Sequence, residues 1–354
     1  MSIPEEVLDW AATSAAEVDA GRAHPRDLFP VLAEAGLIAL GAPANRDAGL
    51  AQQAAVVEAL ARRSLSTAFA LWGHRMSIEY LATAGTDYAD ALLGELRSGH
   101  TPGVSGMASG FKNFVGAGDL DLSLERDGAG GYRLSGSLPW ASNLYSDAVV
   151  ISAAYAPEDT ADDAGERQRV IVAFRLAQEG VTVGRDLNLL ALQGTVSTYV
   201  TLDSVAITEE QVLSWAFRDF LRQCRPSFAI LQTSFCLGLA TESHARTEQK
   251  LTGVNAVFAE DHQDLGRRLS SARQRVCDYA QLVGGEQCSA QDVLSLRLTS
   301  GRLATESAAL EVKTAGGKAY IVDSDVNRRY REATFIPVQS PSEAQLRWEL
   351  SEGR

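Results

Sequence analysis

The strongest constraint on the fold is a change of hydrophobic period along the chain. Residues 5–20, 26–40 and 49–85 place apolar side chains at three- and four-residue spacing, as amphipathic helices do. From about residue 101, short segments alternate apolar and polar residues or are rich in Val, Ile and Thr, with no helical stretch between them. Helical spacing returns at about Glu209 and continues to the end. The pattern predicts helices, then an antiparallel β domain, then further helices.

These boundaries divide the chain into three parts. We expect an N-terminal helical domain at 1–100, a middle antiparallel β domain at 101–208 and a C-terminal helical bundle at 209–354. The fold class is therefore α+β, with helix in the majority. The helical stretch between Leu65 and Leu81 is almost wholly apolar, which predicts a helix buried in a multi-helix core.

Charge narrows the function classes. The sequence has 32 basic and 45 acidic side chains, a formal charge of −13. This balance argues against a nucleic-acid partner, because clustered positive charge supplies most of the affinity for phosphate backbones. The chain has no run of about 20 apolar residues, so we expect no membrane span, and its acidic start predicts no signal peptide. A cytoplasmic enzyme acting on a small-molecule substrate fits these features.

The cysteines give little sign of a metal or redox site. Cys224, Cys236, Cys277 and Cys288 form no CxxC pair, and they are interpreted as small core residues in a reducing compartment. No group of His, Cys, Asp or Glu has the spacing of a zinc site, so we expect no metal.

Four segments together resemble the acyl-CoA dehydrogenase superfamily of flavoproteins. They are FPVLAEAGLIALGAP at 29–43, GYRLSGSLPWASNLYSDAVVISA at 131–153, VTVGRDLNLLALQGTVSTYVTLDSVAIT at 181–208, and the segment from GGKAYIV to QLRWEL at 316–350. The resemblance implies a helical N-terminal domain, a middle antiparallel β domain and a C-terminal four-helix bundle. It also implies FAD as cofactor, with FMN as an alternative. We expect a homodimer or homotetramer, and a hetero-oligomer stays open.

The resemblance assigns flavin contacts residue by residue. Trp140 offers a flat apolar face for the isoalloxazine ring, and Ser142 lies two residues on, on the same side of a strand. In the family, the residue matching Ser142 hydrogen-bonds the flavin N5 region. Met107 and Ser109, at the end of the first strand, match the family's flavin loop. The alternative for Trp140 and Ser142 is a core tryptophan and a turn serine.

Two glycines resemble a family element that serves a neighbouring subunit. Gly316 and Gly317 match the glycine pair that lets one subunit approach the FAD diphosphate of another, although a helix C-cap would also explain them. The segment KLTGVNAVF at 250–258 lacks the family's Arg-x-Thr-Phe-Gly element. Pro341 replaces a cofactor-binding hydroxyl and offers no donor. Both departures weaken FAD binding or favour FMN.

The catalytic base of the family is missing. Removal of an α-proton from an acyl thioester needs a carboxylate, but the matching residue here is Gln339. If the standard reaction took place, Gln339→Glu should rescue it. An alternative family position for the base corresponds to Cys224, which is better interpreted as a core thiol. Glu343 lies about one helical turn beyond Gln339 and is expected to be structural or exposed.

Two further residues are candidates for substrate binding. His74 lies on the apolar helix, where the family often has a histidine near the substrate cavity; a buried, satisfied histidine is the default alternative. Arg225 begins a buried helix, where a structural ion pair is an equal alternative.

Three functions follow from the resemblance. The first is a flavin oxidoreductase that dehydrogenates an acyl thioester with a non-standard base. The second is a flavin-dependent monooxygenase, which needs no α-proton base. The third is a base-lacking subunit that completes the site of a partner chain. Overall resemblance favours the first, whereas the missing glutamate favours the other two.

Overall fold

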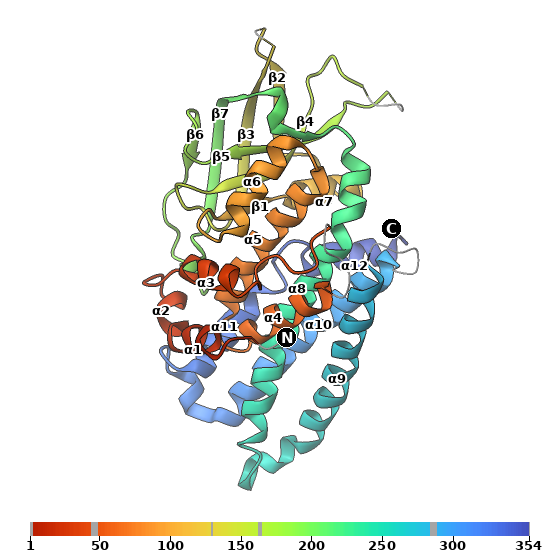
Figure 1. The fold of residues 1–354 in the computed structure, drawn as a ribbon. Helices are drawn as coiled ribbons and strands as arrows, with labels where there is room; N and C mark the ends of the chain where they lie inside the picture. Colours follow the sequence, from red (N-terminus) through yellow and green to blue (C-terminus); the bar gives the residue numbers. More distant parts are fainter. Residues whose placement is uncertain (1–2, 44–48, 129, 162–164, 284–288, 354) are drawn as a thin grey trace.

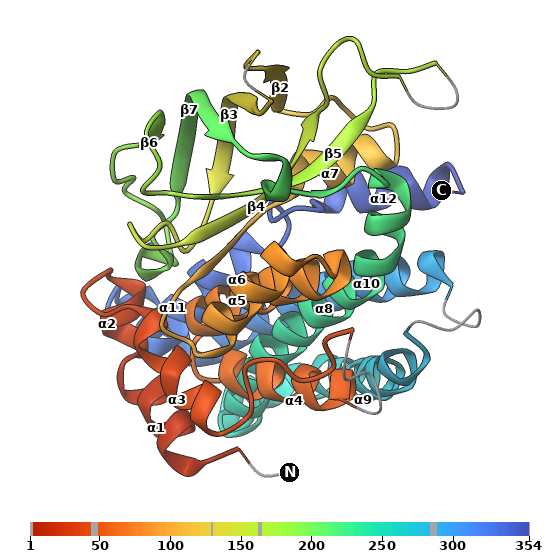
Figure 2. The same ribbon diagram turned by 45° about the horizontal axis from the view of Figure 1, so that its top comes forward.

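The computed structural model describes residues 3–43, 49–128, 130–161, 165–283 and 289–353. Figures 1 and 2 show a twisted sheet as one layer and the helices as the remainder of the molecule. The helix α5 runs beneath the sheet and packs against β1 and β4. Helices precede the sheet, line it and follow it, as the change of period predicts.

The first hundred residues are helical but more broken than the sequence suggests. The expected helix at 5–20 ends at Thr13 and restarts after Ser14, and the expected helix at 49–85 restarts at Ser64, whose side chain caps α5 by accepting from the Thr67 N–H. The α5 residues from Leu65 to Leu81 are buried almost throughout, so this prediction is confirmed. The elements are α1 (Glu5–Thr13), α2 (Ala15–Asp19), η1 (Pro25–Leu28), α3 (Phe29–Glu34), α4 (Gly49–Ala61), α5 (Leu65–Ala84) and α6 (Asp87–Arg97).

The middle region forms a sheet of eight strands, which are β1 (Gly103–Gly106), β2 (Leu122–Arg126), β3 (Tyr132–Ala141), β4 (Val149–Tyr155), β5 (Arg169–Arg175), β6 (Val181–Val183), β7 (Thr198–Ile207) and β8 (Val212–Ser214). Their order is β6-β7-β3-β2-β4-β5-β8, and β1 pairs with β4. The sheet is mainly antiparallel. Two pairings are parallel: β1 with β4 along its whole length, and β2 with β4 through a single residue pair. A short helix, α7 (Ala108–Phe114), also interrupts the expected run of strands.

Helices resume later than the sequence suggests. A single turn, η3 (Glu209–Gln211), begins at a capping box between Thr208 and Gln211, and the strand β8 follows it, so the long helix starts only at Phe217. The remaining elements are α8 (Phe217–Glu248), η4 (Gly253–Phe258), α9 (Ala259–Leu282), α10 (Ala290–Ala315), η5 (Gly316–Tyr320), α11 (Asp325–Phe335) and α12 (Glu343–Ser351). Helices α8, α9 and α10 pack against one another, and α4 packs against α8 and α9.

The buried apolar residues explain this arrangement. One core cluster joins the N-terminal helices, one face of the sheet and the C-terminal helices, and a second cluster fills the other face of the sheet. The predicted α+β class is confirmed, while the domain boundaries stay a prediction. Cys224 and Cys236 are buried as expected, but Cys277 is exposed because it lines an open cavity between α4, α8 and α9; Cys288 lies outside the described residues.

Candidate functional site

An exposed aromatic pair marks the end of β3. Ala141 pairs with Thr198 on β7 and both are buried, so the neighbouring Trp140 and Tyr199 point to the opposite face of the sheet, the face that also carries the core cluster shared with the helices. Trp140 is 62% exposed and Tyr199 is 40% exposed. A tryptophan filling the core would be buried. The geometry therefore favours a surface role for Trp140 and adds Tyr199, which the sequence analysis did not single out.

Ser142 takes part in a chain of hydroxyl groups. Its Oγ lies 2.6 Å from Ser197 Oγ, which lies 2.7 Å from Thr195 Oγ1. Thr195 Oγ1 in turn donates to the Leu192 carbonyl oxygen over 2.7 Å. The chain joins the end of β3 to the loop before β7. Ser197 and Thr195 were also missed from the sequence, because strand register is needed to place them beside Ser142.

The backbone around this chain adopts strained conformations. Asn143 has φ 63°, Leu192 has φ 64° and Val196 has φ 48°. Such angles are unusual outside glycine, and a β-branched residue adopts them rarely. Asn143 is held by bonds from its Nδ2 to the carbonyl oxygens of Ala70 (2.9 Å) and Gly103 (3.2 Å). Strained positions cluster at functional sites, which supports a role for this corner of the sheet.

Met107 and Ser109 lie at the β1–α7 junction. Met107 is fully buried, and the helix begins at Ala108, so Ser109 belongs to α7 and not to the end of a strand as expected. Small residues allow the chain to turn into a helix immediately after β1. A Cβ built on Gly106 would come within 3.2 Å of Leu138 on β3, which places this junction beside β3. The buried Ser109 Oγ has no hydrogen-bond partner within the described part of the chain.

Gly316 and Gly317 lie far from this corner. They open η5 at the end of α10, which Figure 1 draws in blue at the opposite end of the molecule from the sheet. Gly316 has φ 61° and its N–H caps α10 by donating to the Val312 carbonyl. Gly316 is therefore a helix C-cap, the alternative given for it above. A Cβ built on Gly317 meets nothing within 4 Å. The glycine pair and Trp140 do not form one site within a single chain.

Gln339 is held by a buried arginine. Arg297 on α10 is 1% exposed, and its Nη2 donates to Gln339 Oε1 over 3.1 Å. Its Nε donates to Gln232 Oε1 over 3.3 Å, and Gln232 in turn donates to the Ser340 carbonyl oxygen. Gln339 Nε2 also donates to the Ser340 carbonyl. Among the described residues, no carboxylate forms an ion pair with Arg297. The Gln339 amide is thus a partner of a buried cation.

The other candidate bases are also engaged. The Cys224 thiol is buried and lies 3.4 Å from Thr83 Oγ1. Glu343 accepts from Arg302 over 2.9 Å at the half-exposed start of α12. None of the three positions presents a free base.

His74 and Arg225 have structural partners. His74 is fully buried; its Nδ1 accepts from the Gly103 N–H, so its Nε2 donates to the Leu96 carbonyl, each over 3.0 Å. Burial lowers the pKa of His74 to about 3, and the nearby Arg75 acts in the same direction. Arg225 lies inside α8, not at the start of a helix as expected, because α8 continues through Pro226, and it pairs with the buried Glu349 on α12. Both geometries favour the structural alternatives over substrate binding.

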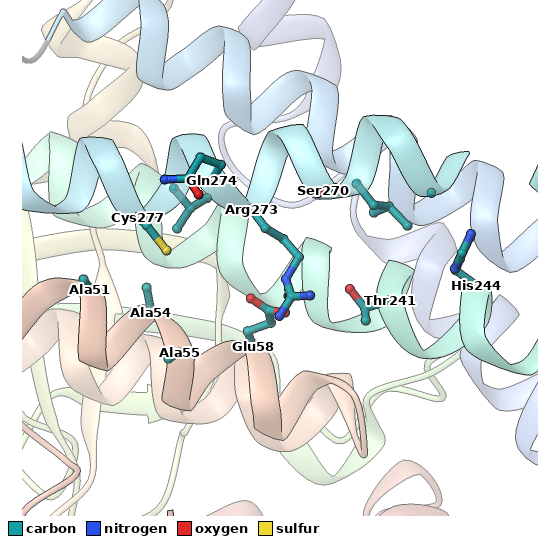
Figure 3. A pocket seen from close by; sticks show the side chains of 13 residues that line it. Ala51, Ala54, Ala55, Glu58, Thr241, His244, Ser270, Arg273, Gln274 and Cys277 are labelled. Carbon is teal, nitrogen blue, oxygen red and sulfur yellow. Dashed lines mark ion pairs between the residues drawn. The ribbon is translucent and has the colours of Figure 1, made fainter. Parts of the chain in front are cut away.

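A separate cavity of about 480 Å³ lies between α4, α8 and α9 (Figure 3). Its wall carries Glu58, whose carboxylate lies 2.9 Å from Arg273 Nε, together with Thr241 and His244. Desolvation raises the pKa of Glu58, and Arg273 opposes this shift. None of the residues expected to bind flavin or substrate lines this cavity.

The corner of the sheet and the junction beside it hold the residues that the resemblance assigns to the flavin ring, whereas the cavity is lined by none of them. They offer an exposed indole face at Trp140, a hydroxyl at Ser142, and the unpartnered Ser109 Oγ at the nearby β1–α7 junction. An unpaired buried hydroxyl is costly unless a ligand or water pairs with it. Within the residues that the structure describes, no cluster of His, Cys, Asp or Glu could hold a metal, and no helix is long and apolar enough to span a membrane.

Comparison with known proteins agrees with this architecture. Residues 4–98 match the family model "Acyl-CoA dehydrogenase, N-terminal domain". The whole chain has the acyl-CoA dehydrogenase fold: glutaryl-coenzyme A dehydrogenase in complex with glutaryl-CoA superposes with a TM-score of 0.85 at 17% identity, covering 99% of this chain and 95% of that one. The resemblance to the acyl-CoA dehydrogenase superfamily is therefore supported.

Other solved structures with this fold bind different ligands. KijD3, in complex with FMN and an amino-keto-sugar nucleotide, has a TM-score of 0.79 at 20% identity, over 98% of this chain and 91% of that one. Dibenzothiophene monooxygenase from Paenibacillus sp. A11-2, also solved with FMN and indole, has a TM-score of 0.79 at 15% identity, over 98% and 94%. No curated protein sequence matches the chain.

Proposed function

We propose that this chain is a flavin-dependent oxidoreductase of the monooxygenase type, acting on a small substrate without removing an α-proton. One observation carries the proposal: Gln339, at the position of the family base, is bonded to the buried Arg297. Cys224 is hydrogen-bonded to Thr83 and Glu343 is paired with Arg302, so neither is a free base, which supports the same conclusion. Dehydrogenation of an acyl thioester, favoured by overall resemblance, needs a base that these positions do not supply.

The chain's own residues would bind and orient the flavin. Trp140 provides an exposed face for stacking, Ser142 and Ser109 provide hydroxyl groups, and Asn143 fixes the corner by tying β3 to α5 and β1. When bound in its reduced form, the flavin supplies two electrons for the activation of O2. Overall, one oxygen atom enters the substrate and the other leaves as water, using two electrons and two protons from the reduced flavin.

We further propose that FMN is preferred to FAD. The η4 segment, Gly253–Phe258, carries no charged side chain, although the family uses this region to reach the FAD of another subunit. Pro341 offers no donor. FMN lacks the adenylate portion that these positions would hold. The complexes of KijD3 and dibenzothiophene monooxygenase with FMN support the same choice.

We propose a homo-oligomer formed through η4 and η5. Asn255 Nδ2 donates to the Thr314 carbonyl over 2.9 Å, which joins η4 to the end of α10 just before η5. Exposed apolar side chains lie in these two segments and directly after η5, and we propose that they form one patch: Val254, Val257, Tyr320, Ile321 and Val322. A contiguous exposed apolar patch is typical of an interaction surface. Analytical ultracentrifugation should show that Val257→Glu dissociates the oligomer, whereas Val338→Glu, at an exposed position outside the patch, should leave it intact.

The activity test separates oxygenation from dehydrogenation. The purified protein is loaded with flavin, and one sample of oxidised enzyme is mixed anaerobically with acyl-CoA thioesters. A second sample is reduced chemically and mixed with O2 and a panel of small aromatic, thioether and amine substrates. The proposal predicts no bleaching of the oxidised flavin by thioesters, and incorporation of ¹⁸O from ¹⁸O2 into at least one product.

Two outcomes would contradict the proposal. Rapid bleaching by an acyl-CoA would establish dehydrogenation and an unrecognised base. Failure to bind flavin, with activity only after addition of a base-bearing partner chain, would establish the accessory-subunit alternative.

A further inference from the structure

We propose that Thr195 and Ser197 are positioning residues that fix Ser142 as a hydrogen-bond acceptor, so that the site prefers reduced flavin to oxidised flavin. This inference rests on the proposed function and deepens it. It names the redox form of the cofactor that the site selects, which the resemblance and the comparisons do not assign.

The direction of each hydrogen bond follows from the donors and acceptors in the chain. A carbonyl oxygen only accepts, so the Thr195 hydroxyl must use its single hydrogen on the Leu192 carbonyl, 2.7 Å away. The 2.7 Å contact between Thr195 and Ser197 then needs the Ser197 hydrogen. The 2.6 Å contact between Ser197 and Ser142 consequently needs the Ser142 hydrogen. Ser142 Oγ is left with lone pairs only.

The carbonyl that starts this chain is firmly held. The Leu192 N–H donates to Asp19 Oδ1 over 3.2 Å, and Asp19 Oδ2 pairs with Arg331 on α11 over 2.6 Å. Leu192 and Val196, on either side of Thr195, both have positive φ angles. Non-glycine residues in this conformation are strained and persist only where the surrounding structure fixes them. The loop is therefore built to hold the two hydroxyl groups in place.

An acceptor distinguishes the two forms of a flavin. Reduced flavin carries an N–H at N5, whereas oxidised flavin has a lone pair there. Among the described residues, no N–H or O–H group donates to Ser142 Oγ, so its lone pairs are available to a ligand. An acceptor facing the N5–H forms a hydrogen bond, whereas the same acceptor facing a lone pair does not. Turning the Ser142 hydrogen outward would lose its bond to Ser197, the outermost bond of the cooperative chain that leads back to Leu192.

The test measures binding of both redox forms. Dissociation constants for oxidised FMN and for anaerobically reduced FMN are measured by fluorescence or calorimetry with the full-length protein. We expect the wild type to bind reduced FMN more tightly. Thr195→Val removes the acceptor for Ser197, which can then turn towards Ser142 and free the Ser142 hydrogen. The dissociation constant for oxidised FMN divided by that for reduced FMN should fall by about 2- to 10-fold, the range for one hydrogen bond.

Two further variants separate polarity from packing. Thr195→Ser keeps the hydroxyl and should restore the wild-type ratio. Ser197→Ala removes the middle of the chain at a half-buried position, so it should lower the ratio even if the buried Thr195→Val variant fails to fold. An unchanged ratio in Ser197→Ala, with flavin still bound, would overturn this inference and leave the proposed function standing. A wild type that binds neither redox form would overturn both.

Discussion

The substitution Gln339→Glu examines the buried contact that underlies the proposed function. Arg297 Nη2 lies 3.1 Å from Gln339 Oε1, so a glutamate at this position would place a carboxylate against a buried guanidinium. Two unit charges about 4 Å apart attract by about 4 kcal/mol at an effective dielectric constant near 20. Removing the carboxylate from water costs several kcal/mol. We therefore expect the stability of the variant at pH 7 to lie within about 2 kcal/mol of the wild type.

The pH dependence gives the sharper result. Arg297 should lower the pKa of the new carboxyl group in the folded state below its unfolded value. Its stabilisation is then present above the unfolded pKa of about 4.3 and is lost as pH falls. A carboxylate held in this way is also a weak base. For that reason the variant should not accelerate anaerobic flavin reduction by acyl thioesters, in contrast to the rescue that the sequence resemblance suggests.

The assay is a double-mutant cycle of Gln339→Glu and Arg297→Met, followed by urea unfolding at several pH values. At pH 7 the coupling free energy between the new carboxylate of the variant and Arg297 should exceed that between the wild-type Gln339 and Arg297 by about 1.5–3 kcal/mol. This difference should decrease at low pH. Gln52→Glu, at an exposed position on α4, is the matched control and should show no such coupling. Absence of coupling at pH 7, or a rate increase of 100-fold or more with an acyl-CoA, would refute the reasoning.

Three further predictions concern the sheet corner and its support. Because burial lowers the pKa of His74 to about 3, against 6.5 when unfolded, its contribution to stability should be full above pH 6.5 and lost as pH falls towards 3, by up to about 5 kcal/mol; His74→Leu should flatten this dependence in urea unfolding, while the exposed His100→Leu should not. Asn143→Ala loses two hydrogen bonds and strains a positive φ, so it should cost about 2–4 kcal/mol of unfolding free energy, and Asn143→Gly about 1 kcal/mol less. Trp140→Ala should weaken flavin binding by about 1–3 kcal/mol in a fluorescence titration, while Tyr330→Ala on α11 should not.

Each of these predictions has a clear contrary result. Parallel pH profiles for wild type and His74→Leu would show that His74 titrates normally. Equal stability of the alanine and glycine variants at Asn143 would show that the positive φ carries no cost. Unchanged flavin affinity in a folded Trp140→Ala variant would show that the indole does not contact the ring.

The overall fold could be predicted from the sequence because its signals are local. The helical spacing, the strand alternation and the apolar run from Leu65 to Leu81 each reflect a face that must be buried. The breaks at Ser14 and Ser64 and the helix α7 were missed, because a hydrophobic period continues across a short interruption. Element boundaries depend on caps, which contribute about 1 kcal/mol each.

The site was harder to predict because its contacts join distant segments. Trp140 and Ser142 were found through the resemblance, but Ser197 lies 55 positions further on and becomes relevant only once β3 and β7 are paired. Arg297 and Gln339 likewise meet across 42 positions. The hydrophobic period of a helix or strand cannot predict a contact between residues so far apart in the sequence. An arginine in an amphipathic helix is expected at the surface, so its burial beside Gln339 needed the tertiary structure.

The central claim is that the corner formed by the end of β3 and the start of β7 binds flavin, and a crystal structure of the protein with bound FMN tests it most directly. The account predicts the isoalloxazine ring against the exposed face of Trp140, with Ser142 Oγ within hydrogen-bond distance of the ring. A ring that lies more than a side-chain length from both residues, for example in the cavity between α4, α8 and α9, would contradict it.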